Sequence, residues 1–394
     1  MTRIGFAYNQ KPDPAPSGEQ AGSSIDSSPA DIPASDDEPP SSRGGVGDDR
    51  PFHAAPALAS ATAPDDEFAE WDTPETIEAV AHALSRLGTV IRLEATPDFP
   101  ERLRAAHVDI VFNIAEGLRG KNRESLVPAI CEFYGVPYSG SDPLTLSLCL
   151  DKGRTKEILS YYGIPTAPFV VVDGGFDGDS RIGVTERLDA LDFPLFIKPI
   201  HEGSSKGITE RNLCCTREEL LAQIEFLLDA YAQPVLVEQF LPGAEFTCAV
   251  LGNGRSARVL PIVGMNFDAL PPGAVPVYGF EAKWVWDNRD APLAIFDCPA
   301  NISDELRQSI ESVALSAYQV LGCRDWSRVD VRLDAAGTPN VVEVNPLPGI
   351  LPDPDDHSCF PKAARAAGIG YDELIQTCLM SAAERHGVRI GGRR

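Results

Sequence analysis

Apolar and polar positions in the first third of the chain follow two different periods. Residues 4–8, 89–93 and 108–114 are short apolar runs, the pattern of strands buried on both faces of a parallel sheet. Between residues 74 and 87 apolar positions recur at helical spacing, after Asp72 and Thr73 as candidate N-caps and Pro74 as the first helical residue. Strands that alternate with helices predict an open α/β domain, which we place at residues 1–145.

Two further units follow this domain. In residues 146–239, apolar strands at 169–172, 195–199 and 235–240 accompany helices at 151–162 and 216–231. Residues 240–394 are richer in strands and close with a helix at 371–386. The predicted fold class is therefore α/β, with α+β character in the C-terminal unit.

Residues 324–349 read as two strands joined by a turn at residues 334–337. Successive strand side chains point to opposite faces, so one face should carry Val329, Val331, Leu333, Val342 and Val344. The opposite face should gather Asp330, Glu343 and Asn345, with Arg328 beside them. Such an oxygen-only set suits a hard cation such as Mg²⁺ better than zinc, although the polar outer face of a hairpin gives the same pattern.

Composition narrows the possible partners. The formal charge of −24 argues against nucleic acid or an anionic membrane. Residues 11–67 are acidic and rich in Pro, Ser and Ala, which predicts a disordered insertion; binding of a basic partner is the alternative. The nine scattered cysteines indicate reduced thiols, and neither a signal peptide nor a membrane-length apolar run is visible. We expect a cytoplasmic protein.

Three stretches could handle a nucleotide. Lys198 ends an apolar strand directly before a glycine- and serine-rich loop at residues 201–207, and such loops bind phosphate through N–H groups and hydroxyls. A flexible surface turn would look the same. Lys283 stands beside Trp284, although a solvated lysine is the simpler interpretation. Residues 238–241 leave a strand where an adenine can bind, or where two domains simply join.

Eight motifs in order add a family resemblance across residues 112–383. They read VPYSGSDP, LDK, FPLFIKPIHEGSSKGI, VLVEQFLPGAEFT, EAKW, GCRDWSRVDVRL, VVEVNPLPG and HSCFPKAARAAG. The chain thereby resembles the D-alanine–D-alanine ligases of the ATP-grasp superfamily. The resemblance implies a three-domain ligase with ATP between the second and third domains. The implied activity is ADP-forming dipeptide synthesis through an acyl phosphate, as in peptidoglycan biosynthesis.

The resemblance also implies roles for single residues. Lys152 and Lys198 would contact the α- and β-phosphates, and Lys283 the γ-phosphate. A lid over the phosphates would comprise Glu202, Gly203, Ser204, Ser205 and Gly207, with Ser204 among the catalytic residues. The adenosine would meet Glu238, Phe240, Leu241 and Glu245, of which Glu245 binds the ribose.

The metal and substrate groups follow from the same resemblance. Two Mg²⁺ ions, or Mn²⁺, would be held by Asp330, Glu343 and Asn345. Arg328 would steady the transferring phosphoryl group and the tetrahedral intermediate, with help from the Gly349 N–H. Ser358 would take the carboxylate of the second amino acid. The expected partners are amino-acid or amine substrates, and a homodimer is possible.

The acceptor half departs from the family pattern. No glutamate motif follows Tyr8 and Asn9, where the family binds the ammonium of the first D-alanine. Glu116 stands where the family has histidine, before a basic run with Arg119, Lys121 and Arg123 that binds an acidic group or forms a solvated loop. The loop between Gly349 and Ser358 is long and acidic. Alternatives therefore stay open: a ligase that adds an amino acid to a non-peptide metabolite, or a catalytically silent nucleotide-binding protein.

Overall fold

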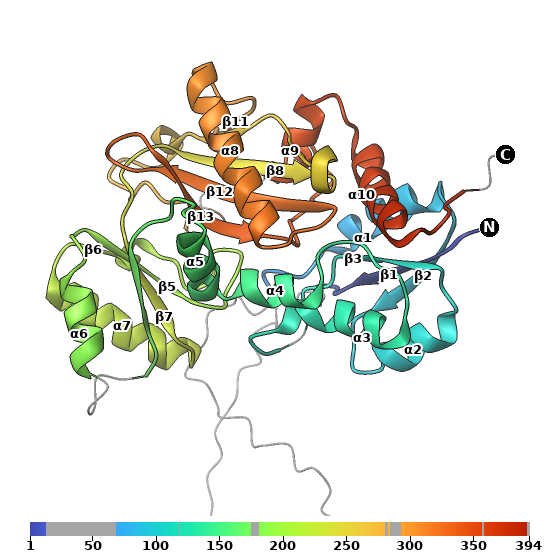
Figure 1. Ribbon diagram of the computed structural model, residues 1–394, viewed down its shortest axis with the longest axis horizontal. Coiled ribbons are helices and arrows are strands. Elements are labelled where there is room, and N and C mark those ends of the chain that lie inside the picture. Colours follow the sequence, from blue (N-terminus) through green and yellow to red (C-terminus); the bar gives the residue numbers. More distant parts are fainter. Residues whose placement is uncertain are drawn as a thin grey trace, which may run out of the picture. The chain divides into compact units, whose positions relative to one another are not determined.

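Three β-sheets organise the part of the chain that the structure describes (Figure 1). The computed structural model describes residues 1–12, 68–117, 119–174, 181–279, 283, 293–356 and 358–391. Residues 11–67 were predicted to be disordered. Of these, only residues 11 and 12 are described here; the rest lie outside the described residues. All elements below belong to one compact unit. No helix in the described ranges is both long and apolar enough to span a membrane.

The first sheet is parallel, with the strand order β2-β1-β3, as the apolar runs predict. Its strands are β1 (Arg3–Tyr8), β2 (Thr89–Glu94) and β3 (Ile110–Asn113). The helices of this region are α1 (Pro74–Ser85), α2 (Phe99–Ala106), α3 (Leu126–Tyr134) and α4 (Pro143–Leu150). Thr73 caps α1 through its hydroxyl, which accepts from the Thr76 N–H at 3.3 Å. Both faces of the sheet are covered by apolar side chains.

The second sheet is antiparallel, with the order β4-β7-β5-β6. Its elements are α5 (Lys152–Tyr161), β4 (Phe169–Val172), α6 (Arg181–Asp189), β5 (Leu195–Pro199), β6 (Leu213–Cys214), α7 (Arg217–Tyr231) and β7 (Val235–Gln239). A capping box of Thr216 and Glu219 fixes the start of α7. Apolar residues of α7 pack on the sheet, so the end of β5 and the loop after it rest on a rigid base.

The third sheet follows the order β11-β10-β8-β12-β13, with β9 paired to β8. Its strands are β8 (Glu245–Leu251), β9 (Arg258–Val259), β10 (Val263–Met265), β11 (Phe296–Asp297), β12 (Trp326–Leu333) and β13 (Pro339–Asn345). The helix α8 (Asp304–Val320) packs against β8, β12 and β13 (Figure 1). The sequence reading did not predict α8, although Ser303 caps it and its first turn is acidic.

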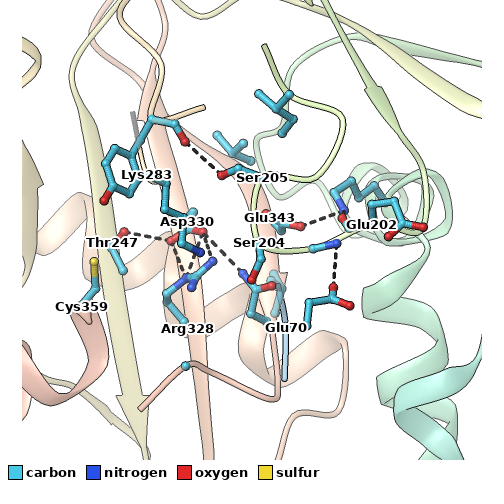
Figure 2. Close-up of a pocket in the computed structure, with 18 of the residues that line it drawn as sticks. Glu70, Glu202, Ser204, Ser205, Thr247, Lys283, Arg328, Asp330, Glu343 and Cys359 are labelled. Carbon is cyan, nitrogen blue, oxygen red and sulfur yellow. Dashed lines mark hydrogen bonds and ion pairs between the residues drawn. The ribbon is translucent and has the colours of Figure 1, made fainter. Parts of the chain in front are cut away.

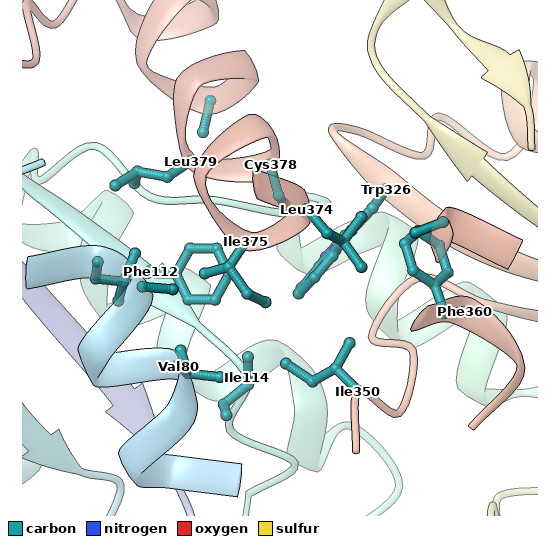
Figure 3. Packing of buried hydrophobic residues seen from close by; sticks show 14 of the residues in the cluster. Val80, Phe112, Ile114, Trp326, Ile350, Phe360, Leu374, Ile375, Cys378 and Leu379 are labelled. Atoms are coloured by element: carbon teal, nitrogen blue, oxygen red, sulfur yellow. The ribbon is translucent and has the colours of Figure 1, made fainter. Parts of the chain in front are cut away.

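The two ends of the chain share one hydrophobic core (Figure 3). Of the last helices, α10 (Tyr371–His386) packs against α1, whereas α9 (Cys359–Ala366) packs against β8 and β10 of the third sheet; both contribute to this core. Trp326 of the third sheet contacts Phe112 of the first edge-to-face, with ring centres 5.5 Å apart. Burying each large apolar side chain contributes about 1.5–3 kcal/mol, so this core joins the first and third sheets firmly. The domain boundaries near residues 145 and 239 stay a prediction.

One residue of the predicted hairpin faces the wrong way. Asp330 lies opposite Glu343 and Val331 opposite Val341, so Val342 is the extra residue of a β-bulge. Val341 and Val344 therefore enter the core beside α8, whereas Val342 is half-buried and does not belong to that core. The prediction that Val342 belongs to the core face was wrong, because a bulge interrupts the two-residue period that it assumed.

Candidate functional site

Almost all the predicted site residues line one cavity of about 310 Å³ (Figure 2). The cavity is bordered by Lys152, Lys198, Glu202, Gly203, Ser204, Ser205, Glu238, Phe240, Leu241, Glu245, Lys283, Arg328, Asp330, Glu343, Asn345, Gly349 and Ser358. Gly207 is the exception. Its backbone has φ +71°, and a side chain there would collide with Pro199. Gly207 therefore shapes the turn of the loop without bordering the cavity.

The hairpin of β12 and β13 places the predicted metal ligands side by side. Arg328 lies opposite Asn345, and Asp330 opposite Glu343, in the antiparallel register. The Arg328 guanidinium donates to both Asp330 oxygens at 3.0–3.1 Å, and the Thr247 hydroxyl donates to one of them at 2.9 Å. The Asn345 amide lies 3.5 Å from the same carboxylate. Two carboxylates and an amide oxygen on one face fit the needs of Mg²⁺, which usually takes one or two carboxylates plus phosphates.

Lysines from the second sheet and α5 surround the other side of the cavity. Lys198 and Lys156 both pair with the Glu238 carboxylate at 2.7 Å, and Lys152 pairs with Glu343 at 2.9 Å. Burial alone would raise the pKa of Glu238, but the two ammonium groups outweigh it and lower the pKa to about 2. Lys156 was not predicted, because it lies inside a helix without a motif. Its side chain is 2% exposed, and its ammonium also contacts the Thr166 hydroxyl at 2.6 Å.

The glycine- and serine-rich loop after β5 borders the same cavity as these lysines. Ser204 and Ser205 have positive φ angles of 49° and 62°, a rare conformation for residues with a side chain. The Ser205 hydroxyl donates to the Tyr278 carbonyl at 3.1 Å. Strained backbone of this kind persists only when neighbouring contacts hold it, and it is frequent at ligand-binding loops.

Glu70 provides one of those contacts, and the sequence reading missed it. Its carboxylate accepts from the Gly203 N–H at 3.0 Å and from the Lys206 ammonium at 3.1 Å. The Arg123 guanidinium holds both Glu70 oxygens at 2.8 and 2.9 Å, and donates to the His201 carbonyl at 2.8 Å. The side chains of Glu70, Arg123 and Lys206 are all less than 10% exposed. A buried ion network thus ties the loop to the segment before α1.

This network corrects the interpretation of the basic run. Arg119 and Lys121 are exposed, as a solvated loop would have them. Arg123 is buried and bound to Glu70, so it is neither solvated nor available for an acidic substrate. No local signal marked the pair, because its two partners are 53 residues apart in the sequence.

The nucleoside end of the cavity combines aromatic, aliphatic and charged groups. Phe240 and Leu241 border it, and the Glu245 carboxylate pairs with Arg332 at 2.8 Å. The Arg332 guanidinium lies 4.7 Å from the centre of the Phe240 ring, within range of a cation–π contact. Burial raises the pKa of Glu245 despite the nearby Arg332. The sequence analysis gave Arg332 no role.

Ser358, the residue predicted to bind the second amino acid, already uses its hydroxyl in hydrogen bonds within the protein. Ser358 is 6% exposed; its hydroxyl donates to the Gly349 carbonyl at 3.0 Å and accepts from the Leu351 N–H at 3.2 Å. Binding a carboxylate through this hydroxyl would require the bond to Gly349 to break, because a hydroxyl has one proton to donate. Cys359, the next residue, borders the cavity beside Thr247, and burial raises the pKa of its thiol to about 11 (Figure 2). A neutral thiol of this kind is no nucleophile.

Comparisons with known proteins identify the family. The model of the D-Ala–D-Ala ligase C-terminus matches residues 158–380. A D-alanine–D-alanine ligase of Actinobacillus pleuropneumoniae is 37% identical over 302 residues, which cover 76% of this chain and 90% of that protein. The chain belongs to the D-alanine–D-alanine ligase family. An uncharacterized protein of Sinorhizobium fredii is 35% identical over 277 residues, 70% of this chain and 75% of the relative.

Solved structures of the D-alanine–D-alanine ligase family share the fold. A crystal structure of D-alanine–D-alanine ligase from Bacillus anthracis complexed with ATP matches with a TM-score of 0.63 at 21% identity, over 98% of this chain and 99% of that one. The predicted ATP-grasp architecture is thereby confirmed. The roles of the individual site residues stay predictions.

Proposed function

We propose that the protein is an ATP-dependent, ADP-forming ligase that joins a carboxylate to an amine. The observation that carries this proposal is the convergence of Asp330, Glu343 and Asn345 with three lysines and Arg328 around one cavity. Family membership supports it, since the relative from Actinobacillus pleuropneumoniae is named a D-alanine–D-alanine ligase and a solved structure of such a ligase contains ATP. A protein that only bound ATP would not need Arg328 beside the metal-binding face.

In this proposal the cationic groups bind the triphosphate. Lys152 and Lys198 contact the α- and β-phosphates, and Lys283 the γ-phosphate. Both Lys152 and Lys198 are bound to carboxylates in the structure, so ATP must exchange phosphate oxygens for Glu343 and Glu238 or share the lysines with them. The loop with Ser204 and Ser205 closes over the phosphates, and Glu70 holds that loop in place.

Mg²⁺ fits the hairpin face. Asp330, Glu343 and Asn345 would hold it, because their oxygens project from neighbouring positions of β12 and β13 and no sulfur or imidazole stands among them. Bound there, Mg²⁺ or Mn²⁺ would neutralise charge on the β- and γ-phosphates.

The chain's own groups then serve two steps. A substrate carboxylate oxygen attacks the γ-phosphorus, which forms an acyl phosphate and releases ADP. An amine next attacks the acyl carbon, and phosphate leaves with the oxygen that came from the carboxylate. Arg328 stabilises the transferring phosphoryl group and, with the Gly349 N–H, the oxyanion of the tetrahedral intermediate. The closed loop excludes water, because an acyl phosphate hydrolyses readily.

The domain division and the setting form part of the same proposal. We assign the three functional domains to residues 1–145, 146–239 and 240–394, since each holds one of the three sheets. We place the enzyme in the cytoplasm, which supplies ATP and keeps thiols reduced; all nine cysteines are free, and most are buried. A homodimer stays a prediction.

An oxygen-transfer experiment tests the proposal. Purified protein with ATP and Mg²⁺ is offered a panel of D- and L-amino acids, and ADP release is measured. With a carboxylate labelled in both oxygens, one labelled oxygen should appear in the released phosphate for each peptide formed. ADP release that ignores every amino acid, or phosphate free of label, would point to an ATPase or a silent nucleotide binder.

A further inference from the structure

Two carboxylates that line the cavity, Glu116 and Glu124, have no partner among the residues that the structure describes. Glu116 follows β3, and Glu124 lies in the short 3₁₀ helix at Arg123–Ser125. Both line the cavity, and Glu124 is 8% exposed. Within the described part of the chain, neither side chain makes a hydrogen bond or an ion pair. Buried carboxylates are normally paired, so this pair needs an explanation.

The nearby cations are committed to other anions. Arg123, the sequence neighbour of Glu124, binds Glu70. Lys206 binds Glu70 and Glu202, the latter at 2.6 Å. Lys152 binds Glu343. The wall near Glu116 and Glu124 is therefore short of positive charge.

The pKa values of Glu116 and Glu124 also indicate that positive charge is scarce around them. Burial, followed by repulsion from Glu124 and Glu70, raises the pKa of Glu116 well above its usual range. Burial also raises the pKa of Glu124, to about 7, although Arg123 opposes the shift. A cation that enters between the two carboxylates would favour their ionised forms.

An ammonium group suits this position. An ammonium group has three N–H donors and can bond to two carboxylates at once. Such charge-assisted hydrogen bonds are strong in a buried site.

We propose that Glu116 and Glu124 form a subsite for a positively charged side-chain group of the substrate, so that the ligase prefers a diamino acid to alanine. The proposal rests on the ligase activity proposed above and names its substrate class. A diamino acid brings a side-chain ammonium in addition to its α-ammonium, and that second cation can bond to Glu116 and Glu124 and favour their ionised forms. The methyl side chain of alanine offers these carboxylates nothing.

Substrate competition tests the subsite. ADP release is measured for wild-type protein with ornithine and with alanine, each in both enantiomers. We expect kcat/KM for the better ornithine enantiomer to exceed that for the better alanine enantiomer by about tenfold or more, the effect of one charge-assisted hydrogen bond. Glu116→Gln and Glu124→Gln keep the side-chain shape, and each should reduce that ratio about tenfold. Glu101→Gln, at an exposed position of α2 in the same domain, is the matched control and should leave the ratio unchanged.

Direct binding separates the subsite from the ligase activity. Calorimetry measures ornithine binding to the full chain with a non-hydrolysable ATP analogue and Mg²⁺. Ornithine binding that weakens in Glu116→Gln and Glu124→Gln supports the subsite, even if no amine supports ADP release and the ligase proposal fails. Alanine as good a substrate as ornithine overturns the subsite, as does a preference for ornithine that survives in both folded variants. Absence of both ornithine binding and ADP release overturns both proposals.

Discussion

The nucleotide half and the acceptor half of the cavity differ in how their charges are balanced. In the nucleotide half, each predicted carboxylate has a cationic partner: Glu238 has Lys156 and Lys198, Glu343 has Lys152, Glu245 has Arg332, and Asp330 has Arg328. In the acceptor half, represented by Glu116 and Glu124, neither carboxylate has such a partner among the described residues, although both line the same cavity. The nucleotide half resembles a site that holds cationic side chains in place for a negatively charged ligand. The acceptor half resembles a site whose ligand itself supplies the positive charge.

The charges are paired where the sequence keeps the family pattern and unpaired where it departs from that pattern. The paired groups stand in motifs that match the ligase family, such as VVEVNPLPG and VLVEQFLPGAEFT. By the motif resemblance, Glu116 would stand where the family has histidine. A pre-paired nucleotide half holds its lysines in place before ATP arrives, and this lowers the ordering cost of binding. Ionised carboxylates without a partner are unfavourable in a buried site, and a cationic substrate group offsets this free energy. The site therefore favours a cationic substrate over a neutral one.

The largest predicted effect concerns the metal-binding face. Glu343→Ala removes a predicted ligand and leaves the Lys152 ammonium without its carboxylate. We expect kcat to fall by about 10³-fold, the scale of losing a preorganised group that stabilises phosphoryl transfer. Amino-acid-dependent ADP release measures it. Glu225→Ala, at an exposed position of α7, is the control. Wild-type turnover in a folded Glu343→Ala protein would refute the metal assignment and the comparison built on it.

The hairpin shows how much of this site could be predicted from the sequence. Alternation placed Asp330, Glu343 and Asn345 on one face, because strand side chains alternate whatever the tertiary context. The same alternation gave a wrong prediction for Val342, since a bulge depends on pairing with the neighbouring strand and leaves no local signal in the sequence. The motif residues were found through their order along the chain. Their hydrogen-bond partners were not.

Glu70 and α8 were missed for opposite reasons. Glu70 lies just after the segment 11–67, whose composition predicted disorder, and its contacts reach 53 and 133 residues along the chain. Such a buried ion network forms only when distant segments meet, so sequence periodicity cannot reveal it. By contrast, α8 carried readable signals: Ser303 as its cap, Asp304 and Glu305 in its first turn, and an apolar stripe toward the third sheet. That helix was predictable.

A second prediction concerns the Glu70 network, which links the two halves. Glu70→Gln can keep the hydrogen bond to the Gly203 N–H but loses its charge, and Arg123 and Lys206 lose a buried partner. Breaking a buried ion pair on one side costs about 3 kcal/mol, and we expect the free energy of unfolding to fall by that amount. Because the loop over the phosphates loses its anchor, KM for ATP should rise about tenfold, a loss near 1.4 kcal/mol.

Denaturant unfolding and ATP-dependent kinetics measure the two effects. Glu78→Gln is a matched control, because Glu78 forms a bidentate pair with Arg92 that is exposed to solvent. Such a surface pair is worth at most about 1 kcal/mol. The Glu70→Gln and Lys206→Met variants should also be non-additive when combined, since both break one network. Additive effects, or a KM for ATP unchanged in Glu70→Gln, would remove Glu70 from the loop-positioning role.

The smallest predicted effect is a pH dependence of nucleotide binding through Lys283. Burial, followed by the nearby Arg328, lowers the pKa of Lys283 to about 8. The ammonium is therefore charged at pH 7 and loses its charge as pH rises through 8, so its attraction for the γ-phosphate weakens in that direction. Between pH 7 and pH 8.5, Kd for a non-hydrolysable ATP analogue should rise about fourfold. Lys283→Arg keeps its charge throughout and should flatten the curve. A wild-type affinity independent of pH would show that Lys283 does not contact the triphosphate. Of the three lysines proposed to bind the triphosphate, Lys152 and Lys198 would then remain, and the assignment of this half to the nucleotide would be correspondingly weaker.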